Sequence, residues 1–298
     1  MKILIPVDGS PFSDAALAFV AARPFREEAQ LYIDVLNVQL PVPPRAGRAV
    51  GAEIVRSWHE AESTKILKPA VGALRRAHLE PAWYWVVGSP GVEIADWADQ
   101  HAVDLIVMGS HGHSALRGLV FGSVTQRVLA STAVPVLVLR TPKAPERASL
   151  RVGVALDGSA YGDAAARYVI QHRSLFGPRP TVSLIHVHAP TWLERQYPLA
   201  TLPSANDLAS AEAEAFDQAL APARALFAES GLAANEHCVV GNPGEEIAQF
   251  ARTAKLDILV MGSHGHGALT GALLGSVASR VAATCSTPLL LIRLGQPG

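Results

Sequence analysis

Residues 108–124 read MGSHGHSALRGLVFGSV, and residues 261–277 read MGSHGHGALTGALLGSV. Both stretches have the form G-x2-G-x9-G-S at identical spacing. Each begins at the end of a short apolar run, LIVM at 105–108 or ILVM at 258–261, and leads into a segment with helical periodicity. Because a strand, a glycine loop and a helix recur together, the chain contains two copies of one folding unit.

Three further pairs of segments repeat in the same order. They are KILIPVDGS (2–10) with RVGVALDGS (151–159), VVGSPGVEIADWA (86–98) with VVGNPGEEIAQFA (239–251), and VPVLVLR (134–140) with TPLLLIR (287–293). Asp8 and Asp157 lie 149 positions apart, whereas Gly109 and Gly262 lie 153 apart. The second copy therefore carries four extra residues in its variable middle.

A polar, proline-containing segment, TPKAPERASL at 141–150, separates the copies and is typical of a short linker. The sequence thus predicts two domains, at 1–142 and 150–298. Each has an ordinary length for one hydrophobic core.

Short apolar runs alternate with helical patterns in each copy. The first copy predicts strands near 2–7, 31–38, 83–88, 104–108 and 135–140, with helices near 12–22, 51–77, 91–101 and 122–131. The second predicts strands near 151–156, 181–187, 236–240, 257–261 and 288–293. The runs lack period-two alternation, which indicates strands covered on both faces. This pattern predicts an α/β fold with doubly wound parallel sheets, whose ligands bind beyond the carboxyl ends of the strands.

Composition narrows the class of protein. The 298 residues are 49% hydrophobic and 17% charged, with a formal net charge of −1 and no basic runs, so neither nucleic acid nor an anionic membrane is an expected partner. No apolar stretch approaches the ~18 to 20 residues that span a bilayer. MKILIPVDGS lacks signal-peptide features, and Cys238 and Cys285 form no disulfide or zinc pattern. A cytoplasmic location is expected.

The repeated motif has the chemistry of a phosphate site. Glycines let the backbone approach a ligand closely, and a helix start presents unpaired N–H groups and a positive dipole end to an anion. Alternatively, the glycines serve only to make turns. Two copies in the same strand-to-helix context favour binding, although duplication by itself establishes only shared ancestry.

The motif, the DGS after the first strand and the strand–helix alternation together resemble the ATP-binding branch of the universal stress protein family, in a tandem form that covers essentially the whole chain. The resemblance implies two Rossmann-like domains, each with a five-stranded parallel sheet of order 3-2-1-4-5. It also implies ATP, with Mg²⁺, as the cofactor, and a role as a nucleotide-dependent regulator of stress responses.

In this family the ends of the first two strands hold the adenine and ribose, and the glycine motif holds the phosphates. The resemblance assigns these binding residues in the first copy: Pro6, Val7, Asp8, Val38, Met108, Gly109, Ser110, His111, Gly112, Gly122, Ser123 and Val124. It assigns these in the second: Leu156, Asp157, Val187, Met261, Gly262, Ser263, His264, Gly265, Gly275, Ser276 and Val277.

Each aspartate has two readings. It can accept a hydrogen bond from ribose or from the base amine, or Asp-Gly-Ser can serve as turn and helix-cap chemistry. The family's proline two residues earlier is present at Pro6 but replaced by Ala155, so the second site departs further from the family pattern than the first.

The histidines add two hypotheses. The usually basic position after the second glycine is His113 or His266. Imidazole is mostly neutral above about pH 6.5, so nucleotide affinity is predicted to fall between pH 6 and pH 8. The H-x-H pairs could also ligate a metal, but zinc needs three or four ligands, and no third ligand is evident. No metal site is therefore predicted.

No catalytic set is recognisable. The motif lacks the lysine of GxxxxGK[ST], and neither a G-x-S-x-G elbow nor a nucleophilic cysteine setting occurs. At most slow ATP hydrolysis is expected. The alternatives to a regulator are a weak ATPase or nucleotide-transforming enzyme, and a scaffold with one or both sites vestigial.

Two surfaces suggest partners. The proline-containing segments 39–50 and 188–206 are predicted to be ordered loops rather than helices, with Trp192 and Tyr197 as candidate partner contacts. The resemblance further implies that Val136–Arg140 faces Leu289–Arg293 in an intramolecular pseudo-dimer. A protein partner and homodimerisation both remain open.

Overall fold

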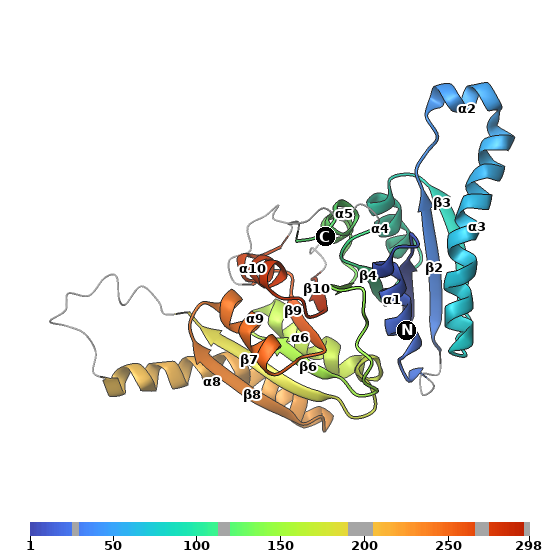
Figure 1. Cartoon of the computed structure of the whole chain (residues 1–298). Coiled ribbons are helices and arrows are strands. Elements are labelled where there is room, and N and C mark those ends of the chain that lie inside the picture. The colour runs from blue at the N-terminus through green and yellow to red at the C-terminus, as the bar shows by residue number, and fades with distance from the viewer. Residues whose placement is uncertain (26–29, 113–119, 190–204, 266–273, 295–298) are drawn as a thin grey trace. The chain divides into compact units, whose positions relative to one another are not determined.

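The computed structural model describes residues 1–25, 30–112, 120–189, 205–265 and 274–294. The chain divides into two compact units, Met1–Ala148 and Ser149–Leu294. Each contains its own parallel sheet with helices on both faces (Figure 1). None of the described helices is long and apolar enough to span a membrane.

The first unit has five parallel strands in the order β3-β2-β1-β4-β5. Their bounds are β1 Lys2–Pro6, β2 Tyr32–Gln39, β3 Ala82–Val87, β4 Leu105–Gly109 and β5 Val136–Leu139. Ile3–Ile5 of β1 and Leu105–Val107 of β4 are completely buried. Consecutive buried residues require cover on both sheet faces, which explains the runs without alternation.

Helices α1 and α3 contact each other and pack on the sheet, and α4 and α5 form a second contacting pair. The helices of this unit are α1 Pro11–Ala21, α2 Pro44–Val50, α3 Ala52–Arg76, α4 Pro90–Gln100 and α5 Ser123–Ser131. Phe19 on α1 and Leu74 on α3 are fully buried.

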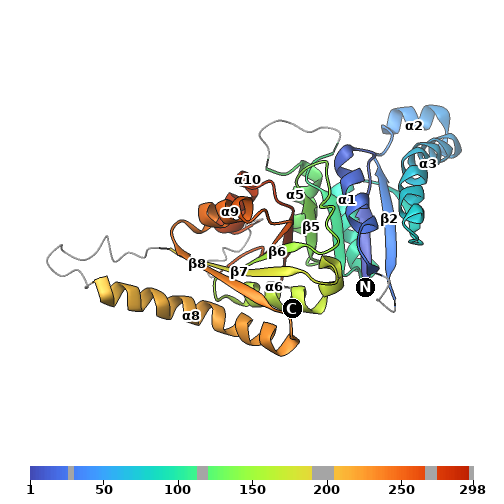
Figure 2. The same ribbon diagram turned by 60° about the horizontal axis from the view of Figure 1, so that its bottom comes forward.

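The second unit repeats this arrangement, with strand order β8-β7-β6-β9-β10. Its strands are β6 Arg151–Ala155, β7 Thr181–His188, β8 Ala234–Val240, β9 Ile258–Gly262 and β10 Leu289–Ile292. Its helices are α6 Ala160–Gln171, the 3₁₀ helix η2 Arg173–Phe176, α8 Ala205–Ser230, α9 Pro243–Thr253 and α10 Ser276–Thr284 (Figure 2). Both units therefore confirm the predicted 3-2-1-4-5 order.

One prediction about the segment after β2 is wrong. Residues 39–50 are not all loop, because Pro44–Val50 form α2. Pro44 stands in the first turn of this helix, where the missing N–H costs nothing and the fixed φ favours helix. The prolines therefore start a helix here instead of preventing one.

Other predictions fall outside what the structure describes. Trp192, Tyr197, His113 and His266 belong to residues that are not described. The predicted pairing of Val136–Arg140 with Leu289–Arg293 would be a contact between the two units, and it stays a prediction. Cys238 is half-buried on β8, and Cys285 is buried directly after α10. Burial raises the pKa of Cys238.

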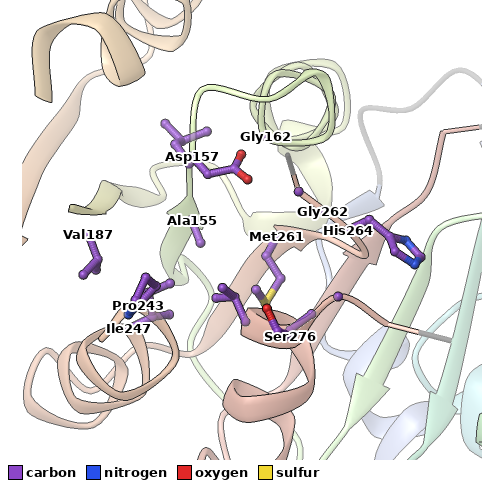
Figure 3. Close-up of a pocket in the computed structure, with 15 residues that line it drawn as sticks. Ala155, Asp157, Gly162, Val187, Pro243, Ile247, Met261, Gly262, His264 and Ser276 are labelled. Atoms are coloured by element: carbon purple, nitrogen blue, oxygen red, sulfur yellow. The ribbon is translucent and has the colours of Figure 1, made fainter. Parts of the chain in front are cut away.

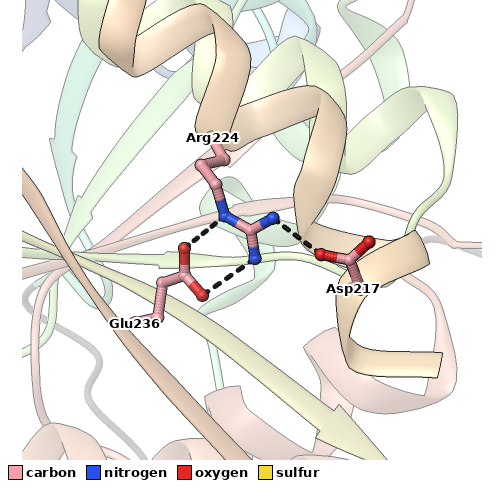
Figure 4. Close-up of polar contacts among 3 residues, drawn as sticks. All are labelled: Asp217, Arg224 and Glu236. Atoms are coloured by element: carbon pink, nitrogen blue, oxygen red, sulfur yellow. Dashed lines mark hydrogen bonds and ion pairs between the residues drawn. The ribbon is translucent and has the colours of Figure 1, made fainter. Parts of the chain in front are cut away.

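An ion cluster joins α8 to the edge strand β8 (Figure 4). The Arg224 guanidinium donates through Nε and Nη2 to the Glu236 carboxylate at 2.7 and 3.1 Å, and through Nη1 to Asp217 at 2.7 Å. These hydrogen bonds hold the pKa of Glu236 below its ordinary value and raise that of Arg224.

Glu236→Gln is expected to lower the free energy of unfolding by less than about 1 kcal/mol at neutral pH, because the partners are largely solvated. A lowered folded pKa stabilises the fold above the ordinary value of about 4.3, and this contribution is lost as the pH falls through the folded pKa. Urea unfolding should thus show the variant and the parent converging in acid. Glu229→Gln, an exposed change on α8, is the control; a difference that persists in acid would contradict this origin.

Candidate functional site

The turn after the first strand of each unit is built from Asp-Gly-Ser. The backbone N–H of Ser10 donates to Asp8 Oδ1 at 2.9 Å, and that of Ser159 donates to Asp157 Oδ1 at 3.0 Å. Gly9 adopts φ 80°, a left-handed conformation that favours glycine. Each aspartate therefore shapes the turn through one carboxylate oxygen.

The helix cap in this turn is the serine, not the aspartate. Ser10 Oγ accepts from the N–H of Ser13, and Ser159 Oγ accepts from the N–H of Gly162, both at 3.3 Å. The helix-cap role expected of Asp-Gly-Ser is therefore performed by the serine in each copy. The aspartate carboxylates lie instead beside the glycine motif.

The second motif glycine lies directly against this carboxylate. A Cβ on Gly112 would overlap Asp8 Oδ2, and one on Gly265 would overlap Asp157 Oδ2. Here glycine permits the close approach of the carboxylate, and its φ angle is not the reason for it. The motif backbone and the aspartate therefore form one continuous surface at the carboxyl end of the sheet.

The first motif glycine lets the neighbouring helix approach. A Cβ on Gly109 would lie 2.5 Å from Phe12 Cβ of α1, and one on Gly262 would lie 2.5 Å from Tyr161 Cβ of α6. The same residue type thus performs two packing functions within one motif.

The third motif glycine starts an uncapped helix. Gly122 precedes α5 and Gly275 precedes α10, and neither helix has a side-chain cap, in contrast to α1 and α6. Their first N–H groups and dipole ends are consequently available to an anion. The N–H of Gly122 donates to Ser110 O and that of Gly275 to Ser263 O, both at 2.8 Å, which closes the loop.

The motif serines after the first glycine support the histidines. Ser110 is fully buried and its Oγ lies 3.0 Å from His111 Nδ1; Ser263 Oγ lies 3.1 Å from His264 Nδ1. Each serine N–H also continues the strand ladder, to Leu139 or Ile292. Neither serine is among the described residues that line the cavities.

A pocket of about 450 Å³ opens at the carboxyl end of the sheet in the first unit. The predicted residues that line it are Pro6, Val7, Asp8, Val38, Met108, Gly109, His111, Gly112, Gly122, Ser123 and Val124. The second unit has a corresponding pocket of about 180 Å³ (Figure 3). Its predicted lining residues are Leu156, Asp157, Val187, Met261, Gly262, His264, Gly265, Gly275, Ser276 and Val277.

Sequence reasoning missed one wall of each pocket. Pro90 and Ile94 at the start of α4 line the first pocket, and Pro243 and Ile247 of α9 occupy the same place in the second. The repeated VVGxPGxEI segments were the available signal. The remaining lining residues not predicted are Ser10, Ser13, Leu36, Leu40 and Thr125 in the first pocket, and Ala155, Gly162 and Ala278 in the second.

The two pockets differ in their supporting contacts. Asn37 Nδ2 donates to Val7 O at 2.7 Å, and at the matching position His186 Nδ1 lies 2.8 Å from Leu156 O. Thr125 Oγ1 donates to Gly109 O at 3.0 Å, whereas the equivalent Ala278 has no hydroxyl. The first pocket therefore has the more extensive hydrogen-bonded base.

Phe121 and Arg140 hold the far end of the first motif. Phe121 is 2% exposed, and the Arg140 guanidinium lies 4.8 Å from its ring centroid while Nη1 donates to Val120 O at 2.5 Å. The residue matching Phe121 in the second unit is Leu274.

The described side chains offer binding groups but not a metal centre. No three His, Cys, Asp or Glu residues gather at one point within the described parts of the chain. Each pocket combines backbone N–H donors at a helix start, one carboxylate and apolar walls. Such a cleft can orient a polar ligand with an anionic end.

Comparisons with known proteins agree with this architecture. A model of the universal stress protein family matches residues 1–140 and 149–293. A universal stress protein of Mycobacterium tuberculosis is 30% identical over 303 residues, covering 98% of this chain and 96% of that protein. One from Mycolicibacterium smegmatis is 25% identical with the same coverages.

A solved universal stress protein from Archaeoglobus fulgidus has the same fold, with a TM-score of 0.70, 22% identity, and coverage of 99% of this chain and 98% of that one. Two shorter matches, with TM-scores of 0.32 and 0.35, are universal stress proteins solved with cAMP and, in Arabidopsis thaliana, with AMP; these ligands are properties of those proteins. Two family matches that together span nearly the whole chain, and relatives alike from end to end, show that this chain belongs to the universal stress protein family.

Proposed function

We propose that each unit binds one adenine nucleotide, and that ATP binding by the chain regulates a stress response. The uncapped starts of α5 and α10 carry this proposal, because their free N–H groups lie in the same pocket as the strand-end aspartate and apolar walls. Anions bind at such helix starts.

The proposed orientation follows from the chemistry of the pocket. The triphosphate lies along Gly112 and the start of α5, where Ser123 Oγ can donate to a phosphate oxygen. Asp8 accepts from a ribose hydroxyl, and the base lies against apolar groups that include Val38 and Ile94. In the second unit Asp157, Val187 and Ser276 take these places.

Mg²⁺ is proposed to arrive with the nucleotide. It prefers phosphate oxygens and water to an all-protein cage, and this pocket provides one nearby carboxylate instead of a cluster. When bound, the ion neutralises phosphate charge. Titrations with Mg²⁺ and with EDTA should show tighter ATP binding in the presence of the ion.

A regulator fits better than an enzyme. Among the described residues that line the two pockets there is no lysine or arginine to stabilise a transferring phosphoryl group. Purified protein should therefore retain nucleotide, identifiable by mass spectrometry, and release phosphate slowly. Rapid release would favour the ATPase alternative, and an empty chain that binds no ATP would favour the scaffold.

The first unit is expected to bind ATP more tightly than the second. Its pocket of about 450 Å³ lies within the range of about 300–1,000 Å³ common for ligand sites, whereas about 180 Å³ lies below it. Calorimetry should resolve two classes of site that differ by about tenfold or more, equivalent to about 1.4 kcal/mol. Gly122→Ala and Gly275→Ala assign them; equal affinities at both sites would contradict the prediction.

A further inference from the structure

An apolar surface adjoins the candidate nucleotide pocket at Leu40, which lines both, and extends over α2 and the start of α3 in the first unit. Val50, Ile54 and Trp58 are 49%, 61% and 48% exposed. Large side chains that expose a contiguous apolar patch generally mark a binding surface. They belong to the helical hairpin at the β3 edge of this unit (Figure 1).

Two adjoining grooves run through this surface. The α2–α3 groove, of about 670 Å³, is lined by residues that include Arg48, Arg56, His59 and Trp85. The apolar groove, of about 520 Å³, is lined only by apolar residue types, Ile54 and Trp58 among them. Both include Pro41, Val42 and Val55, so they form one trough with a charged part and an apolar part.

The charged part has unused polar groups. Arg48 and Arg56 have no hydrogen bond or ion pair with the described residues. His59 is 3% exposed, lines this groove, and its Nδ1 has no hydrogen-bond partner in the described chain. A buried polar group without a partner is uncommon in native proteins.

We propose that this trough binds a medium-chain fatty acid of about twelve carbons as a monomer. Arginine guanidinium groups match the geometry of a carboxylate, so Arg48 and Arg56 hold the head group at the α2–α3 groove. The alkyl tail lies in the apolar groove against Ile54 and Trp58. The adjacency of two cationic side chains to a purely apolar groove selects an amphipathic anion over a neutral or fully polar ligand.

The full-length chain tests this with dodecanoate below its critical micelle concentration. Trp58 and Trp85 line the trough, so intrinsic fluorescence should change at one fatty acid per chain, with calorimetry supplying the stoichiometry. Affinity should rise about tenfold for each two-carbon step from octanoate to dodecanoate as more methylenes are buried. Butyrate should not bind measurably.

Variants separate the head and tail contacts. The double change Arg48→Gln with Arg56→Gln should weaken dodecanoate binding at least about tenfold and leave dodecanol binding unchanged. Ile54→Gln should weaken both ligands, and the exposed change Lys68→Gln on the same helix should weaken neither. Circular dichroism and thermal melting confirm that each variant is folded.

Three results would overturn the proposal. They are dodecanol binding as tightly as dodecanoate, full affinity in the double arginine variant, and binding to anionic phosphatidylserine vesicles without binding of monomeric dodecanoate. The last would identify a membrane-surface contact instead. None of these measurements depends on nucleotide binding, so the two proposals fail separately.

Discussion

Gly112→Ala is expected to empty the nucleotide site of the first unit while the second site stays filled. The new methyl group would overlap Asp8 Oδ2, so either the motif backbone must lift or the carboxylate must turn away. Both movements separate the ribose-binding and phosphate-binding halves of the pocket. We expect affinity at this site to fall about 100-fold, equivalent to about 2.7 kcal/mol.

Native mass spectrometry counts bound nucleotides per chain and checks this directly. The count should fall from two to one in Gly112→Ala, likewise to one in Gly265→Ala, and to none in the double variant. Gly72→Ala is the control, because a methyl group there meets nothing nearer than Arg76 Nη1 at 3.6 Å. A Gly112→Ala protein that still binds two nucleotides would rule out the proposed geometry.

Phe121→Ala is expected to destabilise the first unit by about 3–5 kcal/mol, the usual cost of removing a buried aromatic side chain. The Arg140 guanidinium also loses the ring on which it lies. Because Phe121 immediately precedes the third motif glycine, nucleotide affinity of the first unit should fall as well.

Urea unfolding followed by tryptophan fluorescence suits this measurement, since four of the five tryptophans precede residue 100 and report on the first unit. A two-unit chain can unfold in two steps, and only the first unit's transition should shift. Phe121→Leu reproduces the second unit's residue and should cost clearly less than the alanine change, because it leaves a smaller cavity. Equal losses in both variants would contradict this, because they would show that an aliphatic side chain does not replace the ring and that the Arg140–ring contact, not the buried volume, stabilises this end of the motif.

The sheets could be predicted from the sequence because burial on both faces leaves a direct trace. The runs ending at Met108 and Met261 are apolar without alternation, and the intervening helices have their own period. The helix α2 could not be predicted in the same way. Its prolines suit a loop and a first helical turn equally, and only the contact of α2 with α3 distinguishes them.

The parts of the pocket formed by the repeated motifs could be predicted from the sequence, whereas the parts that depend on how helices pack could not. The glycines and aspartates can be recognised in the sequence, because they recur at fixed spacing. Ile94 and Ile247 cannot be recognised in this way, because their place in the pocket wall depends on how α4 and α9 pack beside the strand ends. Ser110 and Ser263 were assigned as ligand contacts from their place in the motif. In the structure the N–H of each makes one more ladder hydrogen bond just past the strand end, and the hydroxyl of each lies beside a histidine.

The described residues that line each pocket all belong to its own unit. A substitution in one copy therefore leaves the chemistry of the other intact, so selection can act on them separately. The exchanges of Pro6 for Ala155, Asn37 for His186 and Phe121 for Leu274 record how far the copies have already diverged. A duplicated chain of this kind can keep an ancestral ligand in one half while the other half is free to acquire a new one.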